Sequence, residues 1–215
     1  MARQMSRSSV PAERTLTWYV RPLQWVTRGV RALGVACLPT TDAIRGPLYR
    51  RGAPWRTHLC PTDERGEPLS ITGTIRRAVD CEPVANATLD VWQTNARGFY
   101  SNLLGLEDPS NPRAFNLRGR LMSDDKGQYH FDSILPGRYP LFWPLTRPRH
   151  IHVTVRHPHC EPLTTQIFFE GDKYNRWDPW WRASLTIRLE RVATTGSGRV
   201  GHRGVFDITL RQKVS

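Results

Sequence analysis

The chain has 215 residues and a net charge of +12 at pH 7. This length predicts one domain with an appendage, and a hydrophobic fraction of 39% is enough for a buried core. No stretch is apolar over the length that a membrane span requires. Residues 29–39 lack the apolar centre of a secretion signal, because Arg31 interrupts them. The sequence therefore predicts a cytoplasmic protein without a transmembrane segment.

Residues 1–40 are expected to form a basic N-terminal extension. Residues 1–56 contain ten Arg and only two acidic residues, which gives this part of the chain a charge of +8. Such an arm could contact nucleic acid, anionic lipid or a partner subunit. No interleaved aromatic and basic pattern accompanies the charge, so we interpret the arm as a solvated leader and expect no nucleic-acid partner. Pro22 interrupts an otherwise helical spacing of apolar residues, which predicts a helical or irregular extension with a possible oligomer contact.

The cysteines do not indicate a zinc site. None of them forms a C-x-x-C pair, which excludes a zinc ribbon. In a cytoplasmic protein we expect all four to be reduced and partly buried, and a disulfide between Cys60 and Cys81 stays open. The four residues are Cys37, Cys60, Cys81 and Cys160.

From residue 69 onwards, short segments alternate between apolar and polar residues. Turns rich in Gly, Pro, Asn and Asp separate these segments. The pattern predicts an all-β domain over residues 41–215, built as an antiparallel β-sandwich with long active-site loops. The expected strands are 70–76, 87–93, 128–131, 151–155, 163–169, 185–189 and 204–210.

Two histidines mark a candidate metal site in one of these strands. His150 and His152 are two residues apart, so in a strand both side chains point the same way. Ile151, Val153 and Val155 then share the opposite face and are expected in the core. Both imidazoles could reach one ion, although a wet outer face that carries two histidines fits the spacing as well.

Two tyrosines could complete this site. Tyr139 follows Pro136 and Gly137 at the exit of a predicted strand, and Tyr100 follows a glycine in a loop. Phenolate oxygen is a hard anionic donor, which suits a hard, high-valent metal ion. Tyr129, by contrast, alternates with Phe131 in a strand, so we expect it to pack in the core with its hydroxyl hydrogen-bonded.

Several ordered motifs resemble the intradiol ring-cleavage dioxygenases, the family of catechol 1,2-dioxygenase and protocatechuate 3,4-dioxygenase. The similarity covers about residues 44–176, and residues 206–211 resemble the last strand of the family. The motifs are Gly46–Tyr49 with Gly52–Pro54, Leu89–Gln93, Gly98–Tyr100, Asn116–Arg120, Ile134–Pro140, Arg147–His152 and Thr164–Asp172.

The resemblance implies a function and a set of site residues. A non-haem Fe(III) would insert O2 between the two hydroxylated carbons of a catechol-type ring, giving a cis,cis-muconate-type diacid. The implied ligands are Tyr100, Tyr139, His150 and His152, with Tyr139 as the ligand that leaves when the aromatic diol binds. Arg147 and Gln166 would lie over the bound ring, and Ile44, Pro47, Leu48 and Tyr49 are candidates for the pocket wall.

The chain also departs from the family. Only about forty residues stand where catechol 1,2-dioxygenases carry a helical dimerisation domain. The size is closer to a protocatechuate 3,4-dioxygenase subunit, whereas residues 116–120 and 171–174 are more similar to the catechol enzymes. The ring substituents of the substrate therefore stay open, and a homo-oligomer is expected, with a dimer favoured.

Two other classes also fit the pattern. A transthyretin-like or collagen-adhesin-type β-sandwich would bind a partner without catalysis. A cupin-like Fe(II) enzyme would use His150, His152 and Glu170 as a facial triad.

Overall fold

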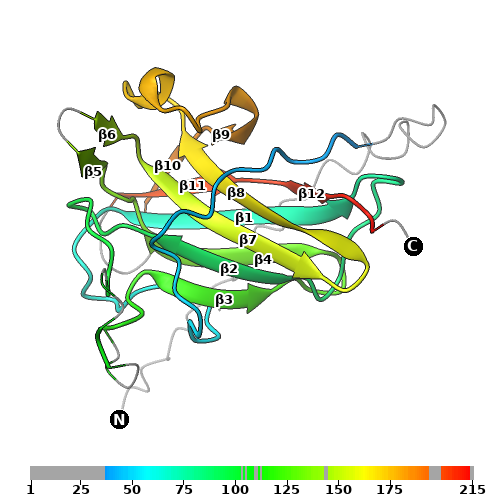
Figure 1. Cartoon of the computed structure of the whole chain (residues 1–215), viewed down its shortest axis with the longest axis horizontal. Helices are drawn as coiled ribbons and strands as arrows, with labels where there is room; N and C mark the ends of the chain where they lie inside the picture. Colours follow the sequence, from blue (N-terminus) through cyan, green and yellow to red (C-terminus); the bar gives the residue numbers. More distant parts are fainter. Residues whose placement is uncertain are drawn as a thin grey trace, which may run out of the picture. The chain divides into compact units, whose positions relative to one another are not determined.

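The computed structural model describes residues 37–102, 104, 106–108, 111, 113–142, 145–193 and 200–213. Residues 1–36, which make up most of the predicted extension, lie outside this set, so its helical or irregular character stays a prediction. The described residues fold as two packed β-sheets with a short hairpin at one end (Figure 1). The predicted all-β sandwich is confirmed.

Each of the two sheets has five strands. The first contains β1 (Pro68–Arg77), β4 (Gln128–Ile134), β10 (Glu190–Ala193), β11 (Val200–Val205) and β12 (Ile208–Leu210). The second has the order β3 (Arg118–Met122), β2 (Thr88–Gln93), β7 (His150–His157), β8 (Cys160–Phe169) and β9 (Thr186–Ile187). The hairpin joins β5 (Tyr139–Phe142) to β6 (Leu145–Arg147), and two 3-10 turns, η2 (Asn175–Trp177) and η3 (Ala183–Leu185), follow β8.

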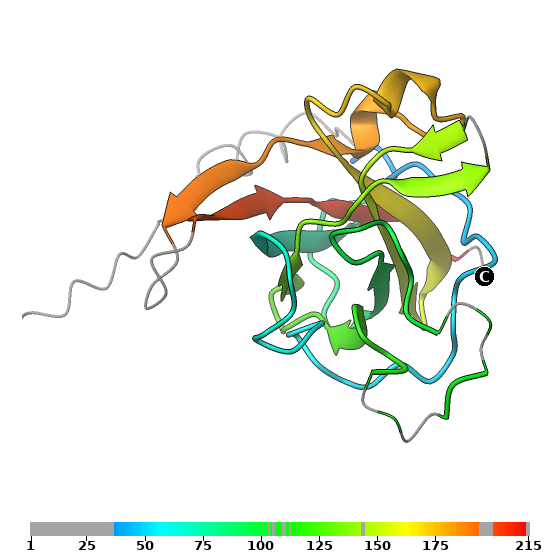
Figure 2. The ribbon, with the colours of Figure 1, turned by 90° about the vertical axis from the view of Figure 1, so that its left-hand side faces the viewer.

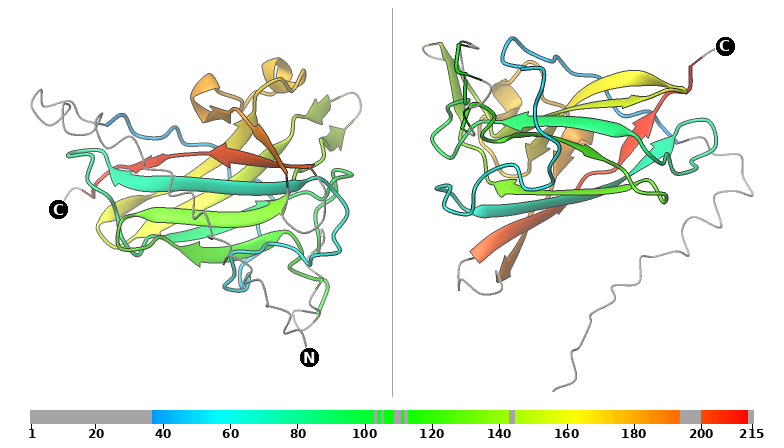
Figure 3. Two further views of the ribbon diagram at one scale, coloured as in Figure 1. Left: turned by 180° about the vertical axis from the view of Figure 1, so that it is seen from behind. Right: turned by 90° about the horizontal axis from the view of Figure 1, so that it is seen from below.

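The strand pairing is mixed, so the antiparallel expectation is wrong in part. β1 pairs antiparallel with β4 but parallel with both β11 and β12, and β8 pairs parallel with β9. Figure 3 shows β1, β4 and β12 side by side in the first sheet. The β1–β11 and β1–β12 pairs are parallel because the chain passes through the other sheet between these strands, whereas β8 and β9 lie in one sheet and are joined by a connection that contains η2 and η3. Figure 2 shows β10 and β11 reaching away from the rest of the sandwich.

Alternating apolar side chains fill the space between the sheets. Ile71 and Ile75 of β1 and Ile151 and Val153 of β7 belong to one continuous core, and all four are fully buried. Each such side chain contributes about 1.5–3 kcal/mol through burial. Tyr129 is buried in the same core, and its hydroxyl donates a 2.5 Å hydrogen bond to the Phe206 carbonyl, as the sequence predicts.

The segment of residues 37–49, which we call the strap, covers the outer face of β7 and β8. The Ala43 amide donates to the Thr164 carbonyl at 2.7 Å, and the Thr165 hydroxyl donates to the Thr41 carbonyl at 2.8 Å. At its start, the Thr40 amide donates to the Thr209 carbonyl of β12 at 3.0 Å. Figure 1 shows the strap crossing the two strands. Both faces of β7 are consequently buried at its histidines.

The prediction of four reduced cysteines is wrong. Cys37, at the start of the strap, forms a disulfide with Cys81, which follows β1 in a turn. The Cys37 amide also donates to the Ala78 carbonyl at 3.1 Å, so the backbone holds the pair together. Cys60 and Cys160 are free, which removes the Cys60–Cys81 alternative. The two cysteines are 44 residues apart in the sequence, and such a spacing does not predict which cysteines pair.

Two glycines join the loops that lead to Tyr100 and Tyr139. A Cβ at Gly98 would lie 2.0 Å from the Arg138 carbonyl oxygen, and one at Gly137 would lie 2.3 Å from the Gly98 nitrogen. The Gly137 amide also donates to the Asn95 carbonyl at 2.8 Å. This close backbone contact fixes the two tyrosine loops to each other.

We expect Gly98→Ala to destabilise the protein by about 2 kcal/mol more than Gly171→Ala. Both glycines have positive φ (+89° and +80°), so both alanines incur about 1–2 kcal/mol of backbone strain. Only the alanine at position 98 would also clash, because nothing lies within 4 Å of a Cβ at Gly171. Urea unfolding of both variants measures the difference, and equal losses would contradict the close contact between the loops.

Candidate metal centre and substrate cavity

His150 and His152 lie at the start of β7, in the middle of the second sheet. His152 is opposite Trp92 of β2 on one side and Gln166 of β8 on the other. Both histidines are buried, with exposed fractions of 2% and 3%, and their ring centroids are 4.9 Å apart. The strand places both imidazoles on the face that the strap covers.

The two predicted tyrosines join this pair. The Tyr100 hydroxyl lies 3.4 Å from Nε2 of His150, and the Tyr100 and Tyr139 rings meet edge to face with centroids 5.5 Å apart. Tyr139, the first residue of β5, is half-buried, whereas Tyr100 is buried. Burial raises the pKa of the Tyr100 phenol above its usual value, and the guanidinium groups of Arg147 and Arg118 oppose this rise.

The backbone fixes the tautomer of His150. Its Nδ1 donates a 2.8 Å hydrogen bond to the Pro148 carbonyl, which leaves the lone pair on Nε2. Burial, and then the charge of Arg147, lower the pKa of His150 to about 3. The imidazole is therefore neutral at physiological pH, with Nε2 directed at the Tyr100 hydroxyl. A metal ligand needs this arrangement.

His152 is held by stacking. Its ring lies parallel to the Trp92 indole, with centroids 4.8 Å apart and an angle of 3° between the planes. Burial is the main cause that lowers its pKa well below the usual value, followed by the neighbouring His150. Its buried Nδ1 atom has no hydrogen-bond partner among the described residues. A buried polar atom without a partner is rare and marks a site at which a further group can bind.

Arg147 is the central cation of the site. It lies directly opposite Tyr139 across the β5–β6 hairpin. Its Nε donates to Asp178 at 2.7 Å, its Nη2 donates to Oε1 of Gln166 at 2.7 Å, and its Nη1 donates to Nε2 of His150 at 3.1 Å. The guanidinium also lies 4.6 Å above the Trp180 ring centroid. Arg147 thus links the hairpin, β8 and the loop after β8 to a predicted ligand.

These residues fit a hard metal ion. Two neutral imidazoles and two phenols meet at one place, and phenolate oxygen favours a high-valent ion such as Fe(III). The facial-triad alternative fits less well, because Glu170 is exposed while both histidines are buried. Among the described residues, no group of three His, Cys, Asp or Glu could hold a metal.

A narrow cavity of ≈ 70 Å³ is lined by three of the four candidate ligands, Tyr100, Tyr139 and His152. Ile44, Pro47 and Leu48 line it, as predicted pocket-wall residues, whereas Tyr49 is not among its lining residues and packs edge to face on Trp92. Gln166 lies behind Arg147, where its Nε2 donates to the Ile44 carbonyl at 3.0 Å. The complete lining is Ile44–Leu48, Tyr100, Tyr139, Leu141, Arg147, His152 and Trp180.

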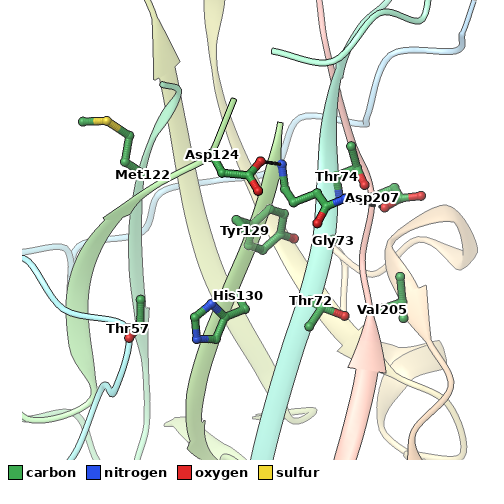
Figure 4. A pocket seen from close by; sticks show the side chains of 11 residues that line it. Thr57, Thr72, Gly73, Thr74, Met122, Asp124, Tyr129, His130, Val205 and Asp207 are labelled. Carbon is green, nitrogen blue, oxygen red and sulfur yellow. Dashed lines mark hydrogen bonds between the residues drawn. The ribbon is translucent and has the colours of Figure 1, made fainter. Parts of the chain in front are cut away.

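Two larger hollows lie elsewhere on the domain. One, of ≈ 510 Å³, lies where β1 and β4 run side by side, with Thr72, Thr74 and His130 around it (Figure 4). The other, of ≈ 590 Å³, lies between residues 58–70 and β11. Neither is lined by a candidate ligand, whereas three of them line the smaller cavity.

Sequence patterns did not indicate three residues that shape this cavity. Asp178 and Trp180 lie in the turn after η2, and Arg45 lies in the strap. Their contribution depends on contacts between distant parts of the chain. A Trp-Asp-Pro-Trp run over residues 177–180 was the available signal for the turn, because a buried acid beside aromatic residues needs a cationic partner.

Comparison with known proteins agrees with this geometry. The "Dioxygenase" family model matches residues 44–212. The chain is 37% identical over 153 residues to a catechol 1,2-dioxygenase of Acinetobacter baylyi, covering 63% of this chain and 48% of that protein. It is 34% identical over 161 residues to the β chain of a protocatechuate 3,4-dioxygenase of Burkholderia cepacia, covering 68% and 65% of the two chains.

The fold has solved counterparts as well. The dioxygenase domain of a carbohydrate-binding fusion protein from Streptomyces sp. SirexAA-E superposes with a TM-score of 0.66 at 31% identity, covering 80% of this chain and 98% of that one. The chain spans between 48% and 64% of the length of three curated relatives.

We expect Asp178→Asn to destabilise the protein by about 3–5 kcal/mol, because it leaves the buried Arg147 guanidinium without its counter-ion. The two side chains are only 6% and 1% exposed. Asp80→Asn is the matched control, since the Arg77–Asp80 pair is 36% and 39% exposed and should contribute less than about 1 kcal/mol. Denaturant unfolding of both variants tests the difference, and a loss at Asp178 no greater than that at Asp80 would show that the buried pair is not needed.

Proposed function

Because this chain belongs to the intradiol ring-cleavage dioxygenase family, we propose that it is a non-haem Fe(III) enzyme that cleaves a catechol-type ring between its two hydroxylated carbons. The product would be a cis,cis-muconate-type diacid that contains both atoms of O2. The observation that carries this proposal is the meeting of four side chains, of which three line one cavity and the fourth, His150, contacts Tyr100 and His152; the three are Tyr100, Tyr139 and His152.

The four side chains would hold the ion with Nε2 of His150, the imidazole of His152 and the phenol oxygens of Tyr100 and Tyr139. When bound, Fe(III) would supply the Lewis acidity and the redox chemistry that a catechol needs in order to react with O2. His150 already presents its lone pair to this position, because the Pro148 carbonyl holds its Nδ1 proton. Coordination through this lone pair would release Nη1 of Arg147 from its present hydrogen bond.

The residues around the ion would bind the diol and move its protons. Tyr139 is the more exposed of the two tyrosines and lines the cavity, so, once deprotonated to the phenolate, its oxygen would be the group placed to accept a proton from an incoming hydroxyl. Arg147 would face the ring, with Asp178 and Gln166 fixing its direction. A fixed guanidinium in a site with little water stabilises negative charge that develops on the substrate. Trp180 and Leu48 would exclude water from the ring.

The substrate, assembly and location also belong to the proposal. The relatives include a catechol 1,2-dioxygenase and the β chain of a protocatechuate 3,4-dioxygenase, so we propose a single-ring aromatic diol as the substrate. We further propose a homo-oligomer, with a dimer favoured.

Among the described residues no helix is long and apolar enough to cross a membrane. We propose a cytoplasmic location. The Cys37–Cys81 disulfide argues against this location, because disulfides persist mainly in oxidising compartments.

We expect the purified protein to bind about one Fe(III) per chain and to show a visible tyrosinate-to-iron charge-transfer band. Phenolate ligands are the source of this band, so it reports on the tyrosines directly. Anaerobic addition of catechol should shift the band, and admission of O2 should bleach it. An absorption spectrum recorded with an iron assay measures each step. A protein that stays colourless after loading with Fe(III) would support the binding-module alternative.

Tyr139→Phe should lower kcat/KM for the diol by about 100-fold or more, because it removes one phenol donor from the site. Tyr129→Phe is the matched control. It also removes one phenol hydroxyl, but that hydroxyl is bonded to the Phe206 carbonyl in the core. The control should lose about 1–2 kcal/mol of stability while keeping its colour and turnover. Iron content, spectrum and kinetics of both variants provide the test, and full turnover by Tyr139→Phe would reject the ligand set.

A further inference from the structure

Two guanidinium groups line the cavity beside the candidate ligands. They belong to Arg45 in the strap and to Arg147 at the end of β6, and no Asp or Glu is among the residues that line the cavity. The cavity wall is therefore positively charged on two sides. A neutral catechol needs one cation at most, to stabilise the charge that develops on its ring.

Arg147 is already committed within the protein. It is buried, it forms its ion pair with Asp178 at 2.7 Å, and a further nitrogen bonds Gln166. Its charge is thus balanced by a carboxylate that lies behind it. Arg45, the second cation at the cavity, has no carboxylate partner of this kind among the described residues.

Arg45 is held beside the site without an acidic partner. Within the described part of the chain no carboxylate forms an ion pair with it, and its guanidinium carbon lies 4.9 Å above the Tyr49 ring centroid. Tyr49 packs on Trp92 at 5.0 Å, and Trp92 stacks on His152. This run of aromatic rings connects the guanidinium to a candidate metal ligand.

The backbone next to Arg45 reaches the same ligand. Gly46 adopts a φ of +71°, and a Cβ there would lie 3.8 Å from Cε1 of His152. The backbone of the residue that follows Arg45 therefore lies beside the imidazole of His152. Its side chain is exposed at the mouth of the cavity, whereas Pro47 and Leu48 provide apolar wall. An arginine in this place can contact a group that projects from a bound ring towards solvent.

We propose that Arg45 is a specificity-determining residue that binds a carboxylate substituent on the catechol ring. The guanidinium fork matches the two oxygens of a carboxylate, and the Tyr49 ring limits the orientations of the side chain. This inference rests on the proposed function, and it narrows the substrate class to carboxylated catechols. Because the side chain is partly solvated, the preference that it adds is about fivefold to tenfold.

The test compares protocatechuate with catechol in the iron-loaded full-length chain. We expect Arg45→Gln to lower the ratio of kcat/KM for protocatechuate to that for catechol by about fivefold to tenfold, and Arg45→Lys to keep part of the ratio. Anaerobic spectral titration should show the same change in the ratio of the two dissociation constants. Arg51→Gln is the control, because it removes the same charge from a nearby exposed position that does not line the cavity. It should leave the ratio unchanged.

The outcomes separate the two proposals. Turnover of catechol with a ratio that Arg45→Gln does not change would overturn the role of Arg45 and leave the proposed function intact. An equal fall of the ratio in Arg51→Gln would also overturn it, since general surface charge would then explain the preference. A wild-type chain that binds no iron and turns over neither diol would instead overturn the proposed function.

Discussion

The register of β7 between β2 and β8 is the constraint on which the rest of the site depends. Pairing with these strands puts His152 between Trp92 and Gln166, and it turns Ile151 and Val153 into the core. A shift by one residue would exchange the two faces, burying the histidines among aliphatic side chains. The apolar face of β7 therefore holds the imidazoles in place. The free energy that orients the candidate ligands comes from packing on the opposite side of the same strand.

The polar groups that are buried on the histidine face of β7 need hydrogen-bond or ion-pair partners, and arginines provide them. Arg118 is buried, and it donates to the Leu48 carbonyl at 2.7 Å and to the Ser101 carbonyl at 2.9 Å. Burial lowers its pKa to about 10. It thereby joins the strap at the mouth of the cavity to the loop that carries Tyr100. Arg147 joins the hairpin to β8 in the same way. Each cation satisfies carbonyl or carboxylate oxygens that would otherwise be buried without partners.

The sequence predicts the sandwich core well, because alternation reports directly on burial. It indicated β1, β2, β4, β7 and β8, whose inward residues are aliphatic or aromatic. It missed β3, which begins Arg-Gly-Arg, and the β5–β6 hairpin, where Pro140 argues against a strand. Parallel pairing of β1 with the last strands leaves no local pattern. Strand spacing, loop position and motif resemblance together identified the two histidines and the two tyrosines. Arg45 reaches the cavity, and Asp178 reaches Arg147, only through long-range packing.

The candidate site is divided between the sheet, which carries the histidines, and the connections, which form the walls of the cavity. The histidines and Gln166 belong to central strands, whose positions the core fixes. The walls of the cavity come from the strap, the hairpin and the turn after η2, which touch the sheet through a few hydrogen bonds and one disulfide. Substitutions in these connections alter the shape and charge of the cavity without disturbing the register of β7. Under the proposed function, ring substituents would contact residues of these connections such as Arg45 and Leu141, while the diol would contact residues of the sheet.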